Sequence, residues 1–229
     1  MVQALKTAFP HTIPVLTGYF FMGAAMAILM VTSGIPAIWA TIMAVAIYAG
    51  SGQFVMVGLL AAGFDPVATF LVILMVNARH IFYGLANLTR FRDFDRYRWY
   101  LIFSLTDETF ALFSSVKVPP EIEERKFLTA IAVLDQLYWI AGCTVGAFAG
   151  TLITFDVTGI EFVMTALFVV ILIQKLQEKD GRSPAFVGLA VAVICRLAFG
   201  SEAFIISTMI ALVAVFALLR PRLDPVEAA

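Results

Sequence analysis

The chain has 229 residues, of which 62% are hydrophobic and only 14% are charged, and its formal net charge is −1. About a quarter of the residues of a soluble domain are charged. A chain of this length with only 14% charged residues has too few of them to cover the surface of a soluble protein. A nearly neutral chain also gives no reason to expect nucleic-acid binding. The composition therefore indicates an integral membrane protein, in the cell (inner) membrane, with lipid around it.

The first three apolar blocks are close to the ~20 residues that span a bilayer core. The block 12–34 follows a short segment with Lys6, which leaves a cleaved signal peptide as an alternative to a membrane span. The length of the apolar run favours a span. The second block, 36–62, is interrupted by "AGSGQ" at 49–53, and the third, 66–88, contains "NARHIFYG".

The rest of the chain contains four more long apolar blocks, at about 127–152, 158–174, 184–199 and 203–219. The segment 101–116 between the two groups is shorter and amphipathic. Because the connections are short, the sequence predicts an all-α, polytopic membrane protein forming one transmembrane domain over residues 1–229.

The positive charges predict the orientation, because cytoplasmic loops carry an excess of Lys and Arg. These residues gather in loops and a tail at 90–98, 117–126, 175–182 and 220–222. The only charges in the turns 63–65, 153–161 and 200–202 are acidic. If 101–116 enters the membrane and returns, this pattern predicts seven crossings, with the N-terminus outside and the C-terminus inside. If 101–116 crosses, there are eight crossings, the N-terminus is inside, and the loop 90–98 breaks the rule.

A weak internal repeat is also visible. "IPVLTGYFFMGA" at 13–24 resembles "IAVLDQLYWIAG" at 131–142, and Arg79 in "ARHIFYG" matches Arg196 in "CRLAFG". A basic loop follows the arginine-bearing block in the first half and precedes it in the second. This placement favours an inverted-topology repeat, as in many secondary transporters, although apolar segments also resemble one another by chance. The predicted halves are residues 10–116 and 127–219.

Five ionisable side chains lie inside the apolar blocks or at their edges: Arg79, Asp107, Glu108, Asp135 and Arg196. A charge at the bilayer centre costs about 2.5–3.5 kcal/mol, so these groups must pair, face water or lie at the interface. Two positive and three negative groups predict a buried ionic network. The arginines either tie helices together or line a path for substrate or protons.

The best functional candidate among these groups is Asp135. On a helix it shares a face with Tyr138 and Trp139, at i+3 and i+4. A carboxylate beside aromatic rings suits an ammonium group, through an ion pair and cation–π attraction.

Four side chains are candidates for proton or ion coupling: His80, Asp107, Glu108 and Asp135. Asp, Glu and His carry protons in many membrane pumps and transporters. Plainer alternatives exist for three of them. Asp107 and Glu108 in "SLTDETFAL" fit the first turn of a helix capped by Ser or Thr, and His80 fits an ordinary histidine of a helix bundle.

The stretch "GSGQ" predicts a broken helix, because glycine costs about 1 kcal/mol relative to alanine inside a helix. A half-helix that begins at Gly52 to Gln53 would point free N–H groups at a cavity and could bind a carboxylate. Close helix packing is the alternative role for the glycines. The predicted substrate site consists of Gly50, Ser51, Gly52, Gln53, Asn77, Arg79, Asp135 and Tyr138.

The sequence shows no motif for metal binding, nucleotide binding or catalysis. Cys143 and Cys195 both lie in apolar blocks, as small buried hydrophobic residues do. The sequence contains no Cys/His cluster with metal-ligand spacing, no Walker motif and no evident nucleophile–base pair. We therefore predict no cofactor, no metal site, no enzymatic activity and no use of ATP by this chain.

Four stretches in the same order, "YAGSGQFVMVGLLAAG", "LVILMVNARHIFYGL", "SLTDETFAL" and "FVVILIQ", resemble the AzlC family of branched-chain amino acid exporters. The resemblance extends over about residues 10–218. It implies efflux of leucine, isoleucine and valine, in some members also methionine, by a large subunit that works with a small hydrophobic membrane protein of the AzlD type. It carries over no binding residues. A transporter or channel for another small amino acid or organic solute is the alternative.

Overall fold

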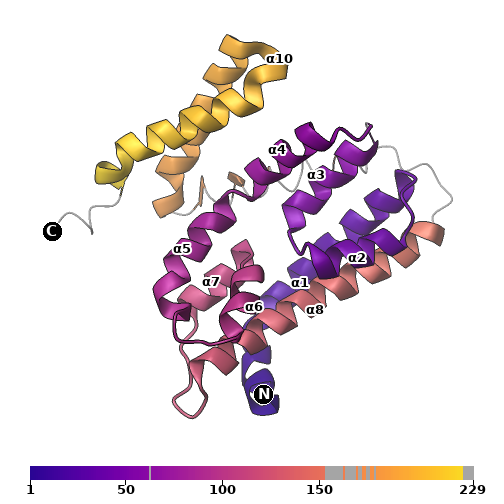
Figure 1. Ribbon diagram of the computed structural model, residues 1–229, viewed down its shortest axis with the longest axis vertical. Coiled ribbons are helices and arrows are strands. Elements are labelled where there is room, and N and C mark those ends of the chain that lie inside the picture. The colour runs from indigo at the N-terminus through magenta and orange to yellow at the C-terminus, as the bar shows by residue number, and fades with distance from the viewer. Residues whose placement is uncertain are drawn as a thin grey trace. The chain divides into compact units, whose positions relative to one another are not determined.

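The computed structural model describes residues 1–61, 63–152 and 179–223, with isolated positions between 162 and 177. The chain divides into two compact units, Met1–Glu161 and Phe162–Ala229, and each is described here by itself. Every secondary-structure element of the described residues is a helix (Figure 1). The predicted all-α class is therefore confirmed.

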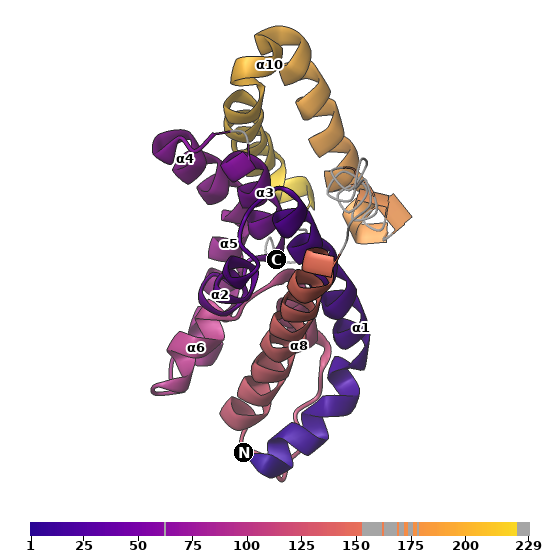
Figure 2. The same cartoon turned by 90° about the vertical axis from the view of Figure 1, so that its right-hand side faces the viewer.

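The first unit is organised around two long helices, α1 (Val2–Thr32) and α8 (Glu124–Leu152). Each is long and apolar enough to cross a membrane, and they contain the predicted blocks 12–34 and 127–152. The two helices pack side by side along their length (Figure 2).

The helices α1 and α8 run in the same direction. Phe20 of α1 lies against Gly142 of α8, and Ala24 lies against Gly146, so residue numbers rise together along both helices. The glycines allow this contact, because a helix without Cβ atoms at these positions lets the other backbone come close.

The block 36–62 does not cross the unit as one span. Helix α2 (Ile38–Ala46) runs antiparallel to α8: Thr41 contacts Thr144, while Gln136 Nε2 donates to the Val45 carbonyl oxygen at 3.1 Å. The helix then breaks, and α3 (Gly50–Ala61) begins. With 9 and 12 residues, neither helix reaches the ~20 residues of a span.

Helix α3 returns toward the end of the unit from which α2 came. It forms an antiparallel hairpin with α4 (Pro66–Asn77), in which the start of α3 at Gly52 faces the end of α4 at Asn77. Asp65 caps α4 by accepting hydrogen bonds from the amides of Val67 and Ala68. In Figure 1 the α3–α4 connection lies far from the N-terminus.

The predicted span 66–88 is a bent pair of helices. Helix α5 (Arg79–Phe91) follows α4 after a 47° bend, and the pair together is long and apolar enough to cross. At the far end of α5, Arg90 forms an ion pair with Glu124 at 2.7 Å, which brings α5 to the start of α8.

The segment 101–116 forms most of a hairpin of two short helices, and whether it crosses the membrane stays a prediction. Helix α6 (Tyr97–Phe103) leads into the unit and α7 (Asp107–Ser115) leads back, where the Phe113 carbonyl accepts from Arg90 Nη1 at 2.6 Å. Thr106 begins α7 as its cap, accepting from the Thr109 amide at 3.2 Å.

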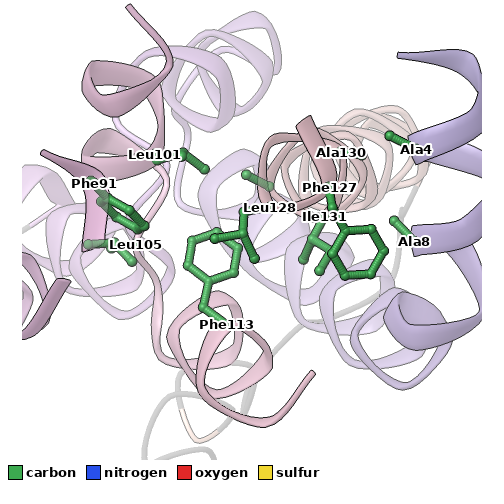
Figure 3. Close-up of a cluster of buried hydrophobic side chains, with 11 residues drawn as sticks. Ala4, Ala8, Phe91, Leu101, Leu105, Phe113, Phe127, Leu128, Ala130 and Ile131 are labelled. Carbon is green, nitrogen blue, oxygen red and sulfur yellow. The ribbon is translucent and has the colours of Figure 1, made fainter. Parts of the chain in front are cut away.

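The N-terminus lies at the same end of this unit as the arginine-rich loop 90–98. Ala4 and Ala8 belong to a buried cluster with Phe91, Phe113 and Phe127 (Figure 3). The seven-crossing prediction set the N-terminus on the opposite side, and it is wrong on this point. Its error has a physical reason: the block 36–62 turns back at its break instead of crossing.

The parallel course of α1 and α8 also bears on the repeat. The segments 13–24 and 131–142 lie on these two helices, and an inverted repeat would set them antiparallel. The structure does not support an inversion between them. The division into halves 10–116 and 127–219 stays a prediction.

In the second unit, α10 (Lys179–Leu223) is one helix with a kink at Gly200, where φ is 70° and ψ is −166°. Its first part, Arg182–Gly200, is a candidate span that matches the predicted block 184–199. Arg196 is exposed on it. The described residues thus contain three candidate spans, or four with the bent pair. The block 158–174, the turn 153–161 and the end of the tail lie wholly or largely outside the described residues.

Candidate substrate site at two helix breaks

Two helix breaks of the first unit meet at Arg79. The first break, residues 47–49, separates α2 from α3, and the second, Ala78, separates α4 from α5. Arg79 Nη1 forms an ion pair with Asp107 Oδ2 at 2.8 Å, and Nη2 donates to Ser51 Oγ at 2.6 Å. One guanidinium therefore joins the starts of α3, α5 and α7, and of the alternatives left open for Arg79 the structure has the ion pair, in a partly exposed position.

The capping interpretation of the "TDET" stretch is confirmed, whereas a role of Asp107 and Glu108 in proton or ion coupling stays a prediction. Asp107 and Glu108 occupy the first turn of α7, behind the capping residue Thr106. In the same positions Asp107 binds Arg79, and it also accepts from Tyr83 Oη at 2.7 Å.

The glycines of "GSGQ" provide space, not an unusual backbone angle. The half-helix begins at Gly50, two residues earlier than expected, and the residue with positive φ at the break is Tyr48, at 46°. A Cβ atom on Gly52 would lie 2.7 Å from Asn77 Nδ2. Gly52 therefore lets the Asn77 side chain lie directly against the start of α3.

Gly50 and Gln53 face Trp139 of α8. A Cβ atom on Gly50 would lie 3.3 Å from the indole ring. Trp139 Nε1 donates to Gln53 Oε1 at 2.9 Å, and this hydrogen bond is fully buried. The second polar atom of this amide, Gln53 Nε2, is buried without a partner.

Asp135 is fully buried in the middle of α8. Thr109 Oγ1 donates to its Oδ2 atom at 3.0 Å, while Oδ1 has no hydrogen-bond partner. The predicted aromatic neighbours have other polar partners: the Tyr138 hydroxyl contacts Thr12 Oγ1 at 2.9 Å, and Trp139 binds Gln53.

Sequence reasoning missed several hydroxyl groups of the site. Tyr19 of α1 donates to Glu108 Oε2 at 2.8 Å and lies 2.5 Å from Thr106 Oγ1. The only signal for Tyr19 in the sequence was a polar atom inside an apolar block. His80 is half-buried, with its ring 5.8 Å from that of Tyr83.

Buried polar atoms without partners are concentrated here. The described residues contain eight such side-chain atoms. Four of the eight lie in the breaks or in the helices beside them, Tyr48 Oη, Gln53 Nε2, Asn77 Oδ1 and Arg79 Nε, and a fifth, Asp135 Oδ1, lies on α8. Each buried unpaired group costs about 1–3 kcal/mol, so such a concentration points to a site that a ligand completes.

Comparison with known proteins identifies the family of this chain. A family model described as "AzlC protein" matches residues 14–153, a range that contains every residue of the candidate site. This chain belongs to the AzlC family. The branched-chain amino acid transport protein AzlC of Bacillus subtilis (strain 168) is 38% identical over 224 residues, covering 98% of this chain and 88% of the relative.

Other relatives are membrane proteins by name. An uncharacterized membrane protein of Helicobacter pylori (strain 26695) is 38% identical over 223 residues, covering 97% of this chain and 98% of the relative. The inner membrane protein YgaZ of Escherichia coli K12 is 26% identical over 178 residues, covering 74% of this chain and 72% of the relative. No solved structure matches this chain. Together with its apolar helices, these relatives identify the chain as a multi-pass membrane protein.

Proposed function

We propose that this protein is the large subunit of a secondary transporter that exports leucine, isoleucine and valine, with methionine as a further substrate. The name of the Bacillus subtilis relative supports branched-chain amino acids as the substrate class. The direction of transport, the coupling ion and the partner subunit are parts of the proposal.

The observation that carries the proposal is the meeting of two broken helices around incompletely bonded polar groups. Non-helical backbone at membrane depth occurs where it is buried in protein or lines a cavity, and transporters use half-helix ends to bind charged substrate groups. The start of α3 has free N–H groups at Gly50, Ser51 and Gly52. We assign the substrate carboxylate to these groups, with Arg79 beside them.

The other half of a zwitterion needs a negative group. Asp135 provides one, with Oδ1 lacking a partner. Asn77 Oδ1 is a second acceptor without a partner, and it lies next to Gly52. We assign the ammonium group to Asp135, with Asn77, Gln53 and Tyr138 as further members of the site.

Two hairpins, α2–α3 and α6–α7, enter the first unit from opposite ends. The rings of Tyr48, at one tip, and Phe103, next to the other, have centroids 6.3 Å apart. We propose that only α1, the bent pair α4–α5 and α8 cross the membrane in this unit. The N-terminus and the loops 90–98 and 117–126 would then be cytoplasmic, as their positive charges favour.

Cysteine labelling tests this orientation. Asp95→Cys should react with an impermeant reagent only from the cytoplasmic side, and Asp65→Cys only from outside. Gln3→Cys should behave like Asp95→Cys. Labelling of Gln3→Cys and Asp95→Cys from opposite sides would refute the arrangement.

We propose protons as the coupling ion, because Asp135 is a fully buried carboxyl group and Glu108 a partly buried one, and both are able to carry protons. We also propose a small AzlD-type membrane subunit as partner, bound through helix faces, since the loops of the described residues are short. Co-purification in mild detergent with a small hydrophobic protein encoded nearby tests the partner. Full export by the pure chain alone would show that the partner is not obligatory.

Transport itself is tested with labelled leucine in vesicles that contain this chain, with and without the small subunit. We expect saturable export, competed by isoleucine and valine but not by leucine amide, which lacks the carboxylate. Flux without saturation would favour a channel. Saturable transport of a different solute would favour the alternative substrate class.

A further inference from the structure

A continuous row of oxygen atoms connects the partly buried carboxyl group of Glu108 with the fully buried carboxyl group of Asp135. Glu108 Oε2 lies 2.8 Å from the Tyr19 hydroxyl, which lies 2.5 Å from Thr106 Oγ1. Thr106 Oγ1 lies 3.0 Å from Thr109 Oγ1, which lies 3.0 Å from Asp135 Oδ2. All four contacts are within hydrogen-bond distance.

Three different elements hold this row in place. Tyr19 comes from α1, Asp135 from α8, and the other members from the first turn and cap of α7. Thr109 and Asp135 are fully buried, and Tyr19 is 3% exposed. Bulk water therefore does not compete for the contacts among Tyr19, Thr106, Thr109 and Asp135, and their geometry depends on the packing of three helices.

The row has fewer hydroxyl hydrogens than oxygen–oxygen contacts. The row contains four oxygen–oxygen contacts but only three hydroxyl groups, on Tyr19, Thr106 and Thr109, each with one hydrogen to donate. If both carboxyl groups are ionised, one contact has no hydrogen between its oxygens. With Tyr19 donating to Glu108, Thr106 to Thr109 and Thr109 to Asp135, that contact is the shortest one, between Tyr19 and Thr106.

One additional proton completes the row. In that state a protonated Glu108 donates to Tyr19, and Tyr19 donates to Thr106. Thr106 then donates to Thr109, and Thr109 donates to an ionised Asp135. A protonated Asp135 gives the same row with every donor reversed. The two states have the same atoms and the same charge.

We propose that Glu108 and Asp135 share one proton, which moves between them along the hydroxyls of Tyr19, Thr106 and Thr109. In one transfer the Glu108 O–H bond breaks, each hydroxyl receives one proton and passes on its own, and an O–H bond forms on Asp135. No oxidant or further reactant is needed. The role of this transfer in transport rests on the proposed function, whereas the shared proton does not.

The surrounding groups suit one shared proton. The charged groups near Glu108 are Asp107 and Arg79, which neutralise each other in an ion pair. The titratable groups near Asp135, apart from Glu108, are the phenols of Tyr19, Tyr48, Tyr100 and Tyr138. An ammonium group at Asp135 would favour its ionised form and drive the proton toward Glu108, which couples substrate binding to proton movement.

Infrared spectroscopy of the purified protein near neutral pH tests the shared proton without any assumption about substrate. We expect the C=O band of a protonated carboxyl group, sensitive to exchange into D2O. The band should disappear in the double variant Glu108→Gln/Asp135→Asn and remain in Glu121→Gln, which changes an exposed loop residue. Thr109→Val removes one link and should shift the band. A wild-type protein without the band would overturn the proposal, whatever the variants do.

Proteoliposomes test the transfer. Leucine exchange across the membrane needs no net proton movement, whereas leucine accumulation driven by a pH gradient does. Thr109→Val should lower the driven accumulation about a hundredfold, the lower range for a positioned proton-transfer group, and lower exchange by a much smaller factor, because it also removes the hydrogen bond to Asp135. Thr109→Ser keeps the hydroxyl and should restore driven accumulation. Thr144→Val removes a hydroxyl contact with Thr41 outside the row and serves as the matched control.

Driven accumulation by Thr109→Val at the wild-type rate would overturn the transfer. So would an equal loss of exchange and accumulation that Thr109→Ser does not restore. If the wild-type protein shows no leucine exchange, the proposed function fails, and the infrared band alone decides whether the proton is shared.

Discussion

The first unit contains two regions of different construction. One is the contact between α1 and α8, and the other is the place where the tips of the hairpins α2–α3 and α6–α7 meet. Between α1 and α8, backbone lies against backbone: a Cβ atom on Gly142 would lie 2.5 Å from the Phe20 carbonyl oxygen. At the tips, polar side chains make the contacts and several of their atoms lack partners. A tightly packed apolar pair can hold costly unpaired groups in place, which suggests that α1 and α8 determine stability and the tips determine transport.

The largest effect is expected where the backbones touch. A Cβ atom on Gly146 would overlap the backbone of Ala24, which cannot move without separating the helices. Gly146→Ala should therefore abolish or strongly reduce folded protein in the membrane, exceeding the ~1–3 kcal/mol typical of overpacking. Gly18→Ala is the control on α1, since nothing lies within 4 Å of that position. Normal folded yield of Gly146→Ala would contradict the division of roles.

Asp135→Asn, in the middle of α8 and facing α7, should have the opposite effect to Gly146→Ala, with transport lost and folded protein kept. Asparagine has nearly the same shape, and its side-chain oxygen can still accept from Thr109. It cannot carry a proton or a negative charge, so export should be abolished while the melting temperature of the purified protein changes little. A loss of folded protein as large as the loss of transport would return Asp135 to a purely structural role.

Arg79→Lys keeps the positive charge but removes the fork that reaches both Asp107 and Ser51. A hydrogen bond to a charged group is worth about 1.5–3 kcal/mol, so transport should fall about tenfold to a hundredfold at equal protein level. Arg90→Lys is the matched control, because Arg90 makes a similar fork with Glu124 and the Phe113 carbonyl. The control should lower the melting temperature and leave the transport rate close to wild type.

Gly52→Ala should reduce transport several-fold with little change in stability. Its Cβ atom would meet the end of the Asn77 side chain, which can rotate away, so the fold survives but the Asn77 amide leaves its place. Gly58→Ala lies on the same helix with nothing within 4 Å, and it should be neutral or slightly stabilising in both measurements. Intact leucine export by Gly52→Ala would remove Asn77 from the site and leave Asp135 as the candidate for the ammonium group.

The features that depend on local sequence could be predicted. Composition identified the membrane class, long apolar runs marked α1 and α8, and the glycines of "GSGQ" marked a break that the structure has within a few residues. The capping pattern of "TDET" was also sufficient to expect the start of α7.

The direction of each helix could not be predicted, because an apolar half-helix that turns back has the same composition as one that continues. The error in block 36–62 reversed the expected side of the N-terminus. The row of hydroxyl groups also could not be predicted from the sequence. Tyr19 and Thr106 are 87 positions apart, Thr109 and Asp135 are 26 positions apart, and their contacts depend on how three helices pack.

The smallest effect is expected outside both regions, in the loop before α8. Glu123 accepts hydrogen bonds from Lys126 and Arg125, which lower the pKa of its carboxyl group. A lowered pKa in the folded protein means that these contacts stabilise it above the ordinary carboxyl pKa and are lost as pH falls through the lowered value. Because the carboxylate is solvent-exposed, solvent screens these pairs and Glu123→Gln should leave transport unchanged and the melting temperature nearly unchanged at neutral pH. Any small difference between variant and wild type should vanish at a pH below the lowered pKa. A large loss of transport in Glu123→Gln would show that charges far from the tips also take part, and would break the division between the two regions.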